Sequence, residues 1–320
     1  MELTLATELG VAAQDGMTAT EAIAQHEGMN WNPTIVQSGY EDGGAWHKDE
    51  GTRHVLRSDT RAPLGTVSPN YSPISVMDAM SIADSLGGQI CGCGEYEGGA
   101  LQWMQIRLND NAHKIVGDDV VEEYMLIVTG HAGKGSLIFK MTPIRVWCKN
   151  TLYAAMKGKT KASGSIRHSG NTDAKISLAR EMLKQAGLFF RDAAEAFTFL
   201  AKTHVTQNTA EGYFRDVAGV KPQHIDMETG ELSGRPATMV DRYLNAYHGV
   251  RGGADKVRGT LWGAYNAVTF VQDHVLVEEK NSKTKHKSAH DRAAYQYFES
   301  GPKVGLEAFD TAQRLAVALN

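Results

Sequence analysis

The sequence predicts an α+β fold, with β-hairpins packed against helices in the N-terminal half (a ββα-type core) and a mostly helical C-terminal half. Three observations lead to this class. Short apolar runs separated by glycine-rich turns recur up to about residue 140, which is typical of hairpins. From about Asp173 the apolar residues recur every three or four positions, as they do in helices. The apolar fraction of 42% over 320 residues is sufficient for a substantial core.

Composition and pattern divide the chain into three regions. These are an acidic N-terminal segment (1–50), an α+β core with a basic strip (51–172) and a helical C-terminal region (173–320). In the first region, a capped helix is predicted to begin within residues 18–26. The polar, glycine-rich residues 40–51 are expected to form a mobile segment.

The core region is expected to contain three hairpins and two helices. The hairpins are predicted over residues 53–71, 87–108 and 122–141. One helix lies between the first two hairpins, starting at Ser72 or Ser75 and stopping at Gly87. The other is predicted to begin after the third hairpin, with Thr142 as its N-cap and Pro143 in its first turn.

The C-terminal region contains four stretches with helical spacing, over residues 172–203, 236–249, 259–279 and 301–319. A polar, basic loop at 280–292 separates the last two. Within the third stretch, Trp262, Tyr265 and Phe270 suit one buried helix face. We therefore assign these aromatic residues to the core.

The stretch GHAGKGS, Gly130 to Ser136, resembles a phosphate-binding loop in its residue types. Its spacing differs, because Gly130 and Gly133 are three apart and Gly135 follows Lys134. A phosphate loop also opens a helix, whereas SLIFKM after this stretch predicts a strand. We predict a hairpin turn that carries Lys134 and His131 outward, and no nucleotide site.

Charge is distributed very unevenly along the chain, although the net charge is only −4. Residues 1–50 hold nine acidic residues against one base, Lys48, which gives −8. Residues 130–172 hold eight Lys and Arg residues and no Asp or Glu, which gives +8. A basic surface of this kind is typical of contacts with phosphates. The acidic segment would then pack on a neighbour's basic surface, or fill it while no DNA is bound.

The basic window supplies our candidate nucleic-acid-binding residues. In the helix predicted from Thr142, a basic face with one aromatic residue follows from the four-residue spacing of Arg145, Lys149, Tyr153 and Lys157. Tyr153 or Trp147 could stack on a base. The full set of candidates is Lys134, Lys140, Arg145, Lys149, Tyr153, Lys157, Lys159, Lys161 and Arg167. The alternative is an ordinary solvated helix face.

Other motifs give weaker signals for chemistry. The pair Cys91 and Cys93 lacks the second pair that a structural zinc site needs, and we expect no metal and no cofactor. The histidines follow no metal-ligand spacing. The carboxylates of residues 118–123 could hold Mg²⁺ in a nucleic-acid enzyme, but a charged strand entrance is the simpler interpretation. We find no catalytic constellation and expect a protein that is not an enzyme.

Three features of the sequence bear on location. No run of about 18 apolar residues occurs, so we expect no membrane span. The first 16 residues lack the basic start of a secretory signal. Three cysteines, an odd number, fit a reducing compartment better than a disulfide framework. Together they predict a cytoplasmic protein, and the family resemblance described next implies a bacterial host cell.

Four segments resemble the phage/plasmid-like protein family, a family of unknown function found in phages, prophages and plasmids. These are LGTVSPNYSPI (64–74), MTPIRVWCKNTL (141–152), GTLWGAYNAVTFVQDH (259–274) and FESGPKVGLEAF (298–309). The similarity covers roughly residues 50–315. It implies a protein encoded by a mobile element and supplies no catalytic residue.

A second resemblance is architectural. Hairpins followed by a basic helix are similar to the core of phage single-strand annealing proteins of the Redβ and RecT type, which form rings or filaments and need no ATP. This resemblance implies an oligomeric single-stranded DNA-binding and annealing protein that acts in recombination or replication. The alternative is a protein that binds a host or phage protein partner and never contacts DNA.

Overall fold

The structure is a computed structural model, and it describes the greater part of the chain. The described residues are 18–24, 29–75, 78–80, 88–133, 135–145, 163–170, 177, 186–249, 256–276 and 301–320. The predicted fold class is confirmed, because antiparallel sheets form the N-terminal half and helices form the C-terminal half. The chain divides into two compact units, which are described separately here.

The first unit, called the sheet unit, takes its residues from 1–110, 123–141 and 160–187. It begins with helix α2 (Ala19–Ala24), which was expected. Thr18 and Glu21 form a capping box, since the Glu21 amide donates to Thr18 Oγ1 at 3.2 Å and the Thr18 amide donates to Glu21 Oε2 at 2.9 Å.

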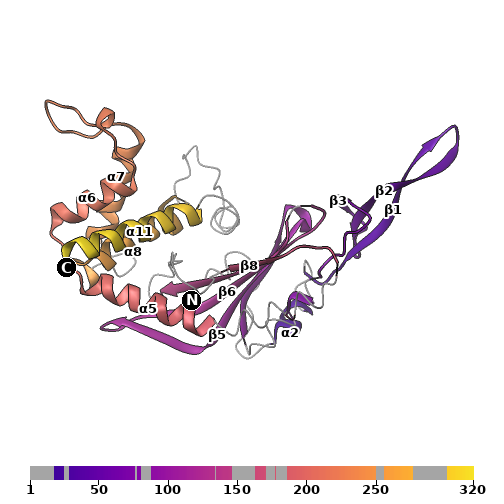
Figure 1. The fold of residues 1–320 in the computed structure, drawn as a ribbon, viewed down its shortest axis with the longest axis horizontal. Helices are drawn as coiled ribbons and strands as arrows, with labels where there is room; N and C mark the ends of the chain where they lie inside the picture. Colours follow the sequence, from indigo (N-terminus) through magenta and orange to yellow (C-terminus); the bar gives the residue numbers. More distant parts are fainter. Residues whose placement is uncertain are drawn as a thin grey trace. The chain divides into compact units, whose positions relative to one another are not determined.

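A three-stranded antiparallel sheet follows, in the order β1 (Pro33–Asp42), β2 (Ala45–Arg57) and β3 (Pro63–Val67). The hairpin of β2 and β3 was predicted from the turn between them and is confirmed. The expectation of a mobile segment at residues 40–51 is wrong for most of this range, because residues 40–42 of β1 pair with residues 45–47 of β2. Gly43 and Gly44 both have positive φ, which allows the tight turn between the two strands. The hairpin extends past β3 (Figure 1).

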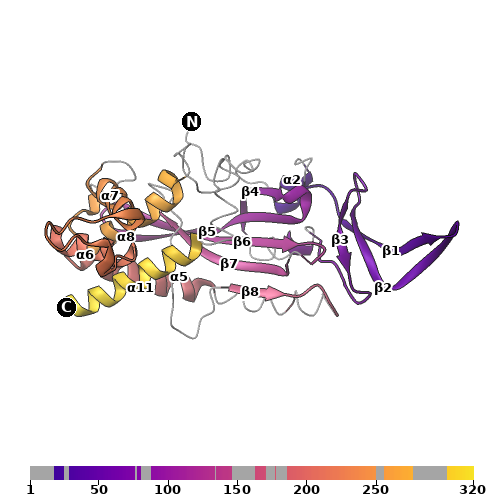
Figure 2. The ribbon, with the colours of Figure 1, turned by 90° about the horizontal axis from the view of Figure 1, so that it is seen from above.

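The second sheet has five strands in chain order: β4 (Gln89–Tyr96), β5 (Leu101–Val116), β6 (Asp119–Gly130), β7 (Leu137–Arg145) and β8 (Ser163–Ile166). The strands lie side by side in this order in Figure 2. The short helix η1 (Glu97–Gly99) connects β4 to β5. Both hairpins predicted in this region are confirmed, and β6 adds a further pairing with β5.

The predicted helix before the second sheet is confirmed at its start only. Ser75 and Asp78 cap it, because the Asp78 amide donates to Ser75 Oγ at 3.1 Å and the Ser75 amide donates to Asp78 Oδ2 at 2.9 Å. Residues 78–80 are helical, and the remainder of the prediction lies outside the described residues.

The prediction of a helix beginning at Thr142 is wrong, because β7 continues to Arg145. Proline within a strand is tolerated where its missing N–H leaves no ladder bond unmade. Among the described residues, the pairing of β7 with β8 runs from Leu137 to Lys140, so Pro143 lies outside it. Residues 146–162 lie outside the described part of the chain.

The second unit, called the helical unit, takes its residues from 111–122, 142–159 and 188–320. The helices described in this unit are α5 (Ala186–Lys202), α6 (Gln207–Val217), η2 (Pro222–His224), α7 (Gly234–His248), α8 (Leu261–Phe270), the π-helical turn η4 (Val271–Val275) and α11 (Gly301–Leu319). The first two residues of α5 belong to the sheet unit. Helix α8 packs against α6, α7 and α11 (Figure 1), and every residue from Leu261 to Thr269 is buried. It is the central helix of this unit.

The core of the helical unit is aromatic. Trp262 and Tyr265 on α8 are fully buried, which confirms their assignment to the core, whereas Phe270 is only half-buried. The ring of Phe197 lies 4.9 Å from that of Trp262, and the ring of Phe309 lies 5.4 Å from that of Tyr265. None of the helices in the described part of the chain has the length and apolar character that a membrane crossing requires.

Candidate nucleic-acid interface

The pairing of β7 with β8 separates an exposed face from a buried one. Leu137 is opposite Ile166, and both side chains are buried. Ile138 is opposite Ser165, and both are exposed. Directly opposed residues share a face, and successive residues alternate between faces. The exposed side of this strand pair is called the β7–β8 face.

Two of the predicted phosphate contacts lie on the β7–β8 face. Lys140 is two residues after Ile138 and therefore shares its face. Arg167 follows β8, where exposed Ser165, buried Ile166 and exposed Arg167 continue the alternation. The register places Arg167 four positions from Lys140 along the ladder, which is about 13 Å at the usual rise of a strand.

The environment of Lys140 differs from that of Arg167. The side chain of Lys140 is partly buried in the sheet unit, and this burial lowers the pKa of its ammonium group to about 8. Arg167 is exposed. The face therefore carries one cation whose charge titrates just above neutral pH and one whose charge is permanent.

The other predicted contacts are placed only in part. Arg145 is the last residue of β7, so it does not begin the predicted basic helix face. The structure does not describe Lys134, Lys149, Tyr153, Lys157, Lys159 or Lys161. Their role in binding stays a prediction from the sequence.

The GHAGKGS stretch joins β6 to β7, and the predicted turn is confirmed. A strand follows it, whereas a phosphate-binding loop leads into a helix. The expectation that His131 points outward is wrong, because its side chain is 0% exposed. Burial, together with the nearby His168, lowers the pKa of His131 to about 3. His131 is therefore neutral at physiological pH.

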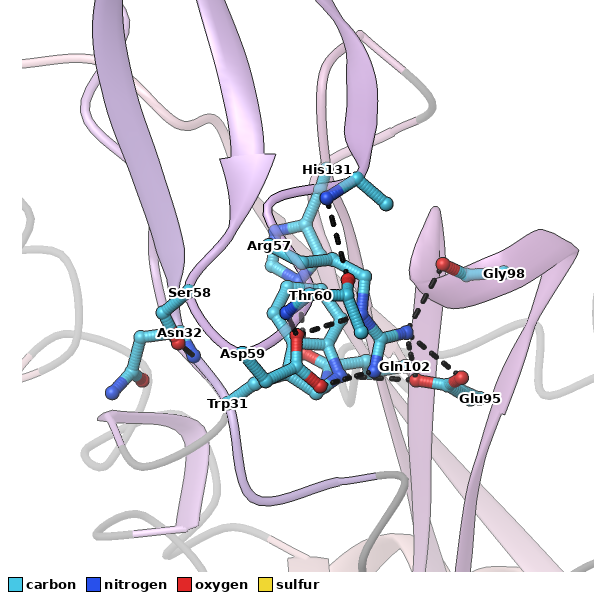
Figure 3. A network of polar contacts seen from close by, with 11 residues as sticks. Trp31, Asn32, Arg57, Ser58, Asp59, Thr60, Glu95, Gly98, Gln102 and His131 are labelled. Carbon is cyan, nitrogen blue, oxygen red and sulfur yellow. Dashed lines mark hydrogen bonds and ion pairs between the residues drawn. The ribbon is translucent and has the colours of Figure 1, made fainter.

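A buried polar cluster in the sheet unit explains why His131 turns inward (Figure 3). Arg57, at the end of β2, is 7% exposed and lies at the centre of the cluster. Its guanidinium donates to Glu95 Oε2 at 2.7 Å and to Asp59 Oδ2 at 2.8 Å. It also stacks over the ring of Trp31 at 4.3 Å, and the Trp31 indole N–H donates to Glu95 at 3.0 Å.

The charges in this cluster stabilise one another. Hydrogen bonding to Arg57 is the main cause that lowers the pKa of Asp59 to about 2. The same contact raises the pKa of Arg57. Gly99 lets the backbone approach closely, because a Cβ atom there would fall 2.5 Å from the Trp31 ring. The Asp59 carboxylate thus remains ionised at neutral pH.

His131 extends the cluster toward His168. Its Nε2 atom lies 2.8 Å from Gln102 Oε1, and its ring lies 5.4 Å from Trp31 and 6.2 Å from His168. His168 accepts from the amide of Ile74 at 2.9 Å and stacks on Tyr71. The contacts of this cluster join β2, β4, β5 and the turn after β6, which indicates a structural role.

This cluster was not predicted from the sequence. Its members Trp31, Arg57, Glu95, His131 and His168 are separated by 26 to 38 residues, and of the residues in contact only Arg57 and Asp59 lie in one short segment. The one local signal was the pair Gly98–Gly99 directly after Glu95, since adjacent glycines often mark a close approach of backbone to side chain.

One of the carboxylates considered as a Mg²⁺ site, that of Asp119, has another role. Asp118 lies in the turn before β6 and Asp119 begins the strand, so the expected charged strand entrance is confirmed. Asp119 is buried, and its Oδ2 accepts from the Trp262 indole N–H at 2.7 Å within the helical unit. In the described ranges, no three His, Cys, Asp or Glu residues are grouped as metal ligands would be.

Cys93 is also poorly suited to catalysis or metal binding. Its side chain is buried, and burial raises the pKa of its thiol to about 11. A thiol with this pKa is protonated at neutral pH and is a poor nucleophile and metal ligand. The neighbouring Cys91 is partly exposed, and neither cysteine is in a disulfide.

Comparison with known proteins gives one match. The family model of the domain of unknown function DUF932 matches residues 63–296. The predicted membership of a family of unknown function is confirmed at this level. No curated protein and no solved structure matches the chain. The resemblance to single-strand annealing proteins stays a prediction.

Proposed function

The chain belongs to the DUF932 family, whose function is unknown, and we propose that it binds single-stranded DNA through the β7–β8 face and anneals complementary strands without ATP. It would act as an oligomer in the recombination or replication of a phage or another mobile element. The observation that carries the proposal is the position of Lys140 and Arg167, which are 27 residues apart in sequence but lie on the same face of the β7–β8 strand pair, with Arg167 exposed and Lys140 partly buried.

The surroundings of the two cations support contact with phosphate. The window of residues 130–172 contains no acidic residue, so no carboxylate of that segment would repel a phosphate chain. Cations about 13 Å apart along a strand can contact one extended backbone at two points. Contacts to phosphates leave the base edges free, which is what a second, complementary strand requires.

ATP has no part in the proposal. The one stretch that resembled a nucleotide site, GHAGKGS, is the turn between β6 and β7. Annealing of complementary strands is downhill, so a protein that holds a strand extended and neutralises its charge can accelerate pairing without an energy source.

Fluorescence anisotropy of a labelled strand of about 40 nucleotides, titrated with the full chain over a salt series, tests the proposal. A variant with Lys140→Gln and Arg167→Gln should bind about 25-fold more weakly at 0.1 M salt, because each phosphate contact contributes roughly fivefold relative to 1 M salt. The slope of log K against log salt should become less steep by about 1.4.

The matched control carries Lys202→Gln and Arg235→Gln, which remove the same charge from exposed positions outside the basic window. Its affinity and slope should stay close to those of the unaltered protein. An equal loss of affinity in both variants would show a general effect of net charge and contradict binding through the β7–β8 face. No binding by the unaltered protein at low salt would refute the proposed function.

A second assay separates annealing from simple binding. Two complementary strands that carry a donor and an acceptor fluorophore should pair faster with the protein present, and ATP should not change the rate. Binding without faster pairing would leave a single-strand-binding protein and remove annealing from the proposal.

A further inference from the structure

The tip of the β1–β2 hairpin exposes two large aromatic side chains. Tyr40 is 60% exposed and Trp46 is 64% exposed. The hairpin register pairs Tyr40 with His47 and Glu41 with Trp46, so the two aromatic residues lie on opposite faces. Neither face is covered in the described part of the chain, because every residue from Tyr40 to Lys48 is exposed.

Both aromatic side chains pack against neighbouring residues of the hairpin. The Tyr40 ring stacks on His47 at a centroid distance of 5.4 Å. The Trp46 ring lies over Gly39, where a Cβ atom would come within 2.4 Å of it. Ordered, exposed Trp and Tyr are the residue types that anchor protein interfaces, because they present a large area at little entropic cost.

The tip is also acidic. Residues 40–50 hold Glu41, Asp42, Asp49 and Glu50 against one base, Lys48, so this segment carries −3. That charge disfavours a nucleic acid as its ligand. A two-stranded hairpin with no third strand is marginally stable in water by itself, so a partner that covers this part would stabilise it. Such a partner should be basic and partly apolar.

The chain itself carries a surface with these properties. The β7–β8 face holds Lys140 and Arg167 and also the apolar side chain of Ile138, which is 38% exposed. It lies in the window without acidic residues, so it is complementary in charge to the tip. An apolar side chain beside cations suits Trp46, because the carboxylate of Glu41 lies opposite Trp46 on the same face of the hairpin.

We propose that the hairpin tip of one copy docks on the β7–β8 face of a second copy. Trp46 would contact Ile138, and Glu41, which shares the face of Trp46, would pair with Lys140 or Arg167. Asp42 lies on the opposite face and adds to the negative charge of the tip. The contact is head-to-tail, because the tip and the face are different surfaces, and repetition of it produces rings or filaments. This inference shares its surface with the proposed function but does not depend on DNA binding.

Photo-crosslinking tests the contact directly. Trp46 is replaced by p-benzoylphenylalanine, and the variant is mixed with an equal amount of the unaltered chain labelled with ¹⁵N, in the absence of nucleic acid. Mass spectrometry should find peptides that join position 46 of the light copy to residues 135–145 or 163–170 of the heavy copy. The control places the same photo-reactive residue at Met227, which is 88% exposed, and should give no such peptide.

Charge exchange makes the test specific. Adding Glu41→Lys and Asp42→Lys to the light copy should reduce the crosslink at least tenfold. A heavy copy with Lys140→Glu and Arg167→Glu should then restore it. Circular dichroism of each variant checks that it is folded. Crosslinks only within one chain, crosslinks only to other surfaces of the second copy, no crosslinks, or no restoration by the exchanged charges would each overturn the proposal.

The two proposals can fail separately. Glu41→Lys with Asp42→Lys leaves Lys140 and Arg167 intact, so this variant should bind a labelled strand at least as tightly as the unaltered protein. A crosslink without DNA binding would retain the contact and refute the proposed function. DNA binding without the crosslink would retain the proposed function and refute the contact between copies.

Discussion

The sheet unit and the helical unit hold their interiors together in different ways. At the centre of the sheet unit, Arg57 is 7% exposed and is surrounded by carboxylates and the Trp31 ring. At the centre of the helical unit, the rings of Phe197, Trp262 and Phe309 are fully buried and lie against one another. The interior of the sheet unit depends on hydrogen bonds between charged groups, which are directional. The interior of the helical unit depends on close packing of aromatic rings.

This difference sets how each unit should respond to change. A charged hydrogen bond depends on the protonation state of both partners, so the stability of the sheet unit should vary with pH. Packing of rings depends on shape and burial, which pH does not alter. Substitutions at the two centres should therefore cost similar free energies at neutral pH and differ in acid.

The largest loss is expected from Phe309→Ala in α11. The Phe309 ring contacts Phe197 and Tyr265, and truncation leaves a cavity that costs about 4 kcal/mol of unfolding free energy. Urea denaturation followed by tryptophan fluorescence measures it. Val317→Ala on the same helix, where the side chain is 71% exposed, should change stability by less than about 0.5 kcal/mol. An equal effect of the two substitutions would contradict the aromatic core.

Arg57→Met is expected to lower the free energy of unfolding by about 3 kcal/mol. This is the low end for breaking a buried ion pair, because the side chains of Glu95 and Asp59 are 25% and 31% exposed and can be hydrated. Arg191→Met, at a 63% exposed side chain, is the control and should be nearly neutral. The same urea titration measures both. A loss below about 1 kcal/mol would show that the cluster contributes little.

Low pH should weaken the polar centre of the sheet unit and leave the aromatic centre of the helical unit unchanged. The pKa of Asp59 is lowered from 3.8 to about 2, so its contribution is complete above pH 3.8 and is lost as the pH falls toward 2. The difference between the Arg57→Met variant and the unaltered protein should therefore shrink from pH 5 to pH 2.5. The difference caused by Phe309→Ala should stay constant over this range. A constant difference for both would contradict a role for the charge of Asp59.

Trp262→Phe should have a smaller effect, about 2 kcal/mol. The substitution keeps most of the ring but removes the N–H that donates to the buried Asp119 carboxylate at 2.7 Å. Trp46→Phe, at an exposed ring, is the matched control and should change stability by less than about 0.5 kcal/mol. A neutral result at Trp262 would mean that packing alone accounts for its burial.

Local patterns predicted the elements of both units well. The spacing of Trp262 and Tyr265 indicated a buried helix, and helix α8 confirms it. A turn around Asp59 to Pro63 indicated the hairpin of β2 with β3, and glycines between apolar runs indicated the hairpin of β4 with β5. These features depend on residues that are near one another in sequence, where periodicity and turn chemistry are informative.

Other features could not be predicted, because they depend on contacts that are distant in sequence. Thr142 and Pro143 form a plausible helix start, but β7 continues through them because it lies in the sheet. The polar residues of the β1–β2 hairpin gave no apolar alternation, and only the pairing of two strands makes them a strand pair. His131 was expected outside because its segment is polar, although its contact with Gln102 draws it inside.

The smallest predicted effect concerns two cations of the sheet unit whose pKa values are shifted in opposite directions. Partners raise the pKa of Arg57, whereas burial lowers the pKa of Lys140 from 10.5 to about 8. Lys140 is therefore protonated below pH 8 and loses its charge as the pH rises above this value. If it contacts phosphate, the affinity for a labelled strand at about 0.1 M salt should fall roughly fivefold from pH 7 to pH 9.5. Lys140→Arg keeps the charge and should abolish the fall, so a variant that retains the same pH dependence would assign the titration to another group.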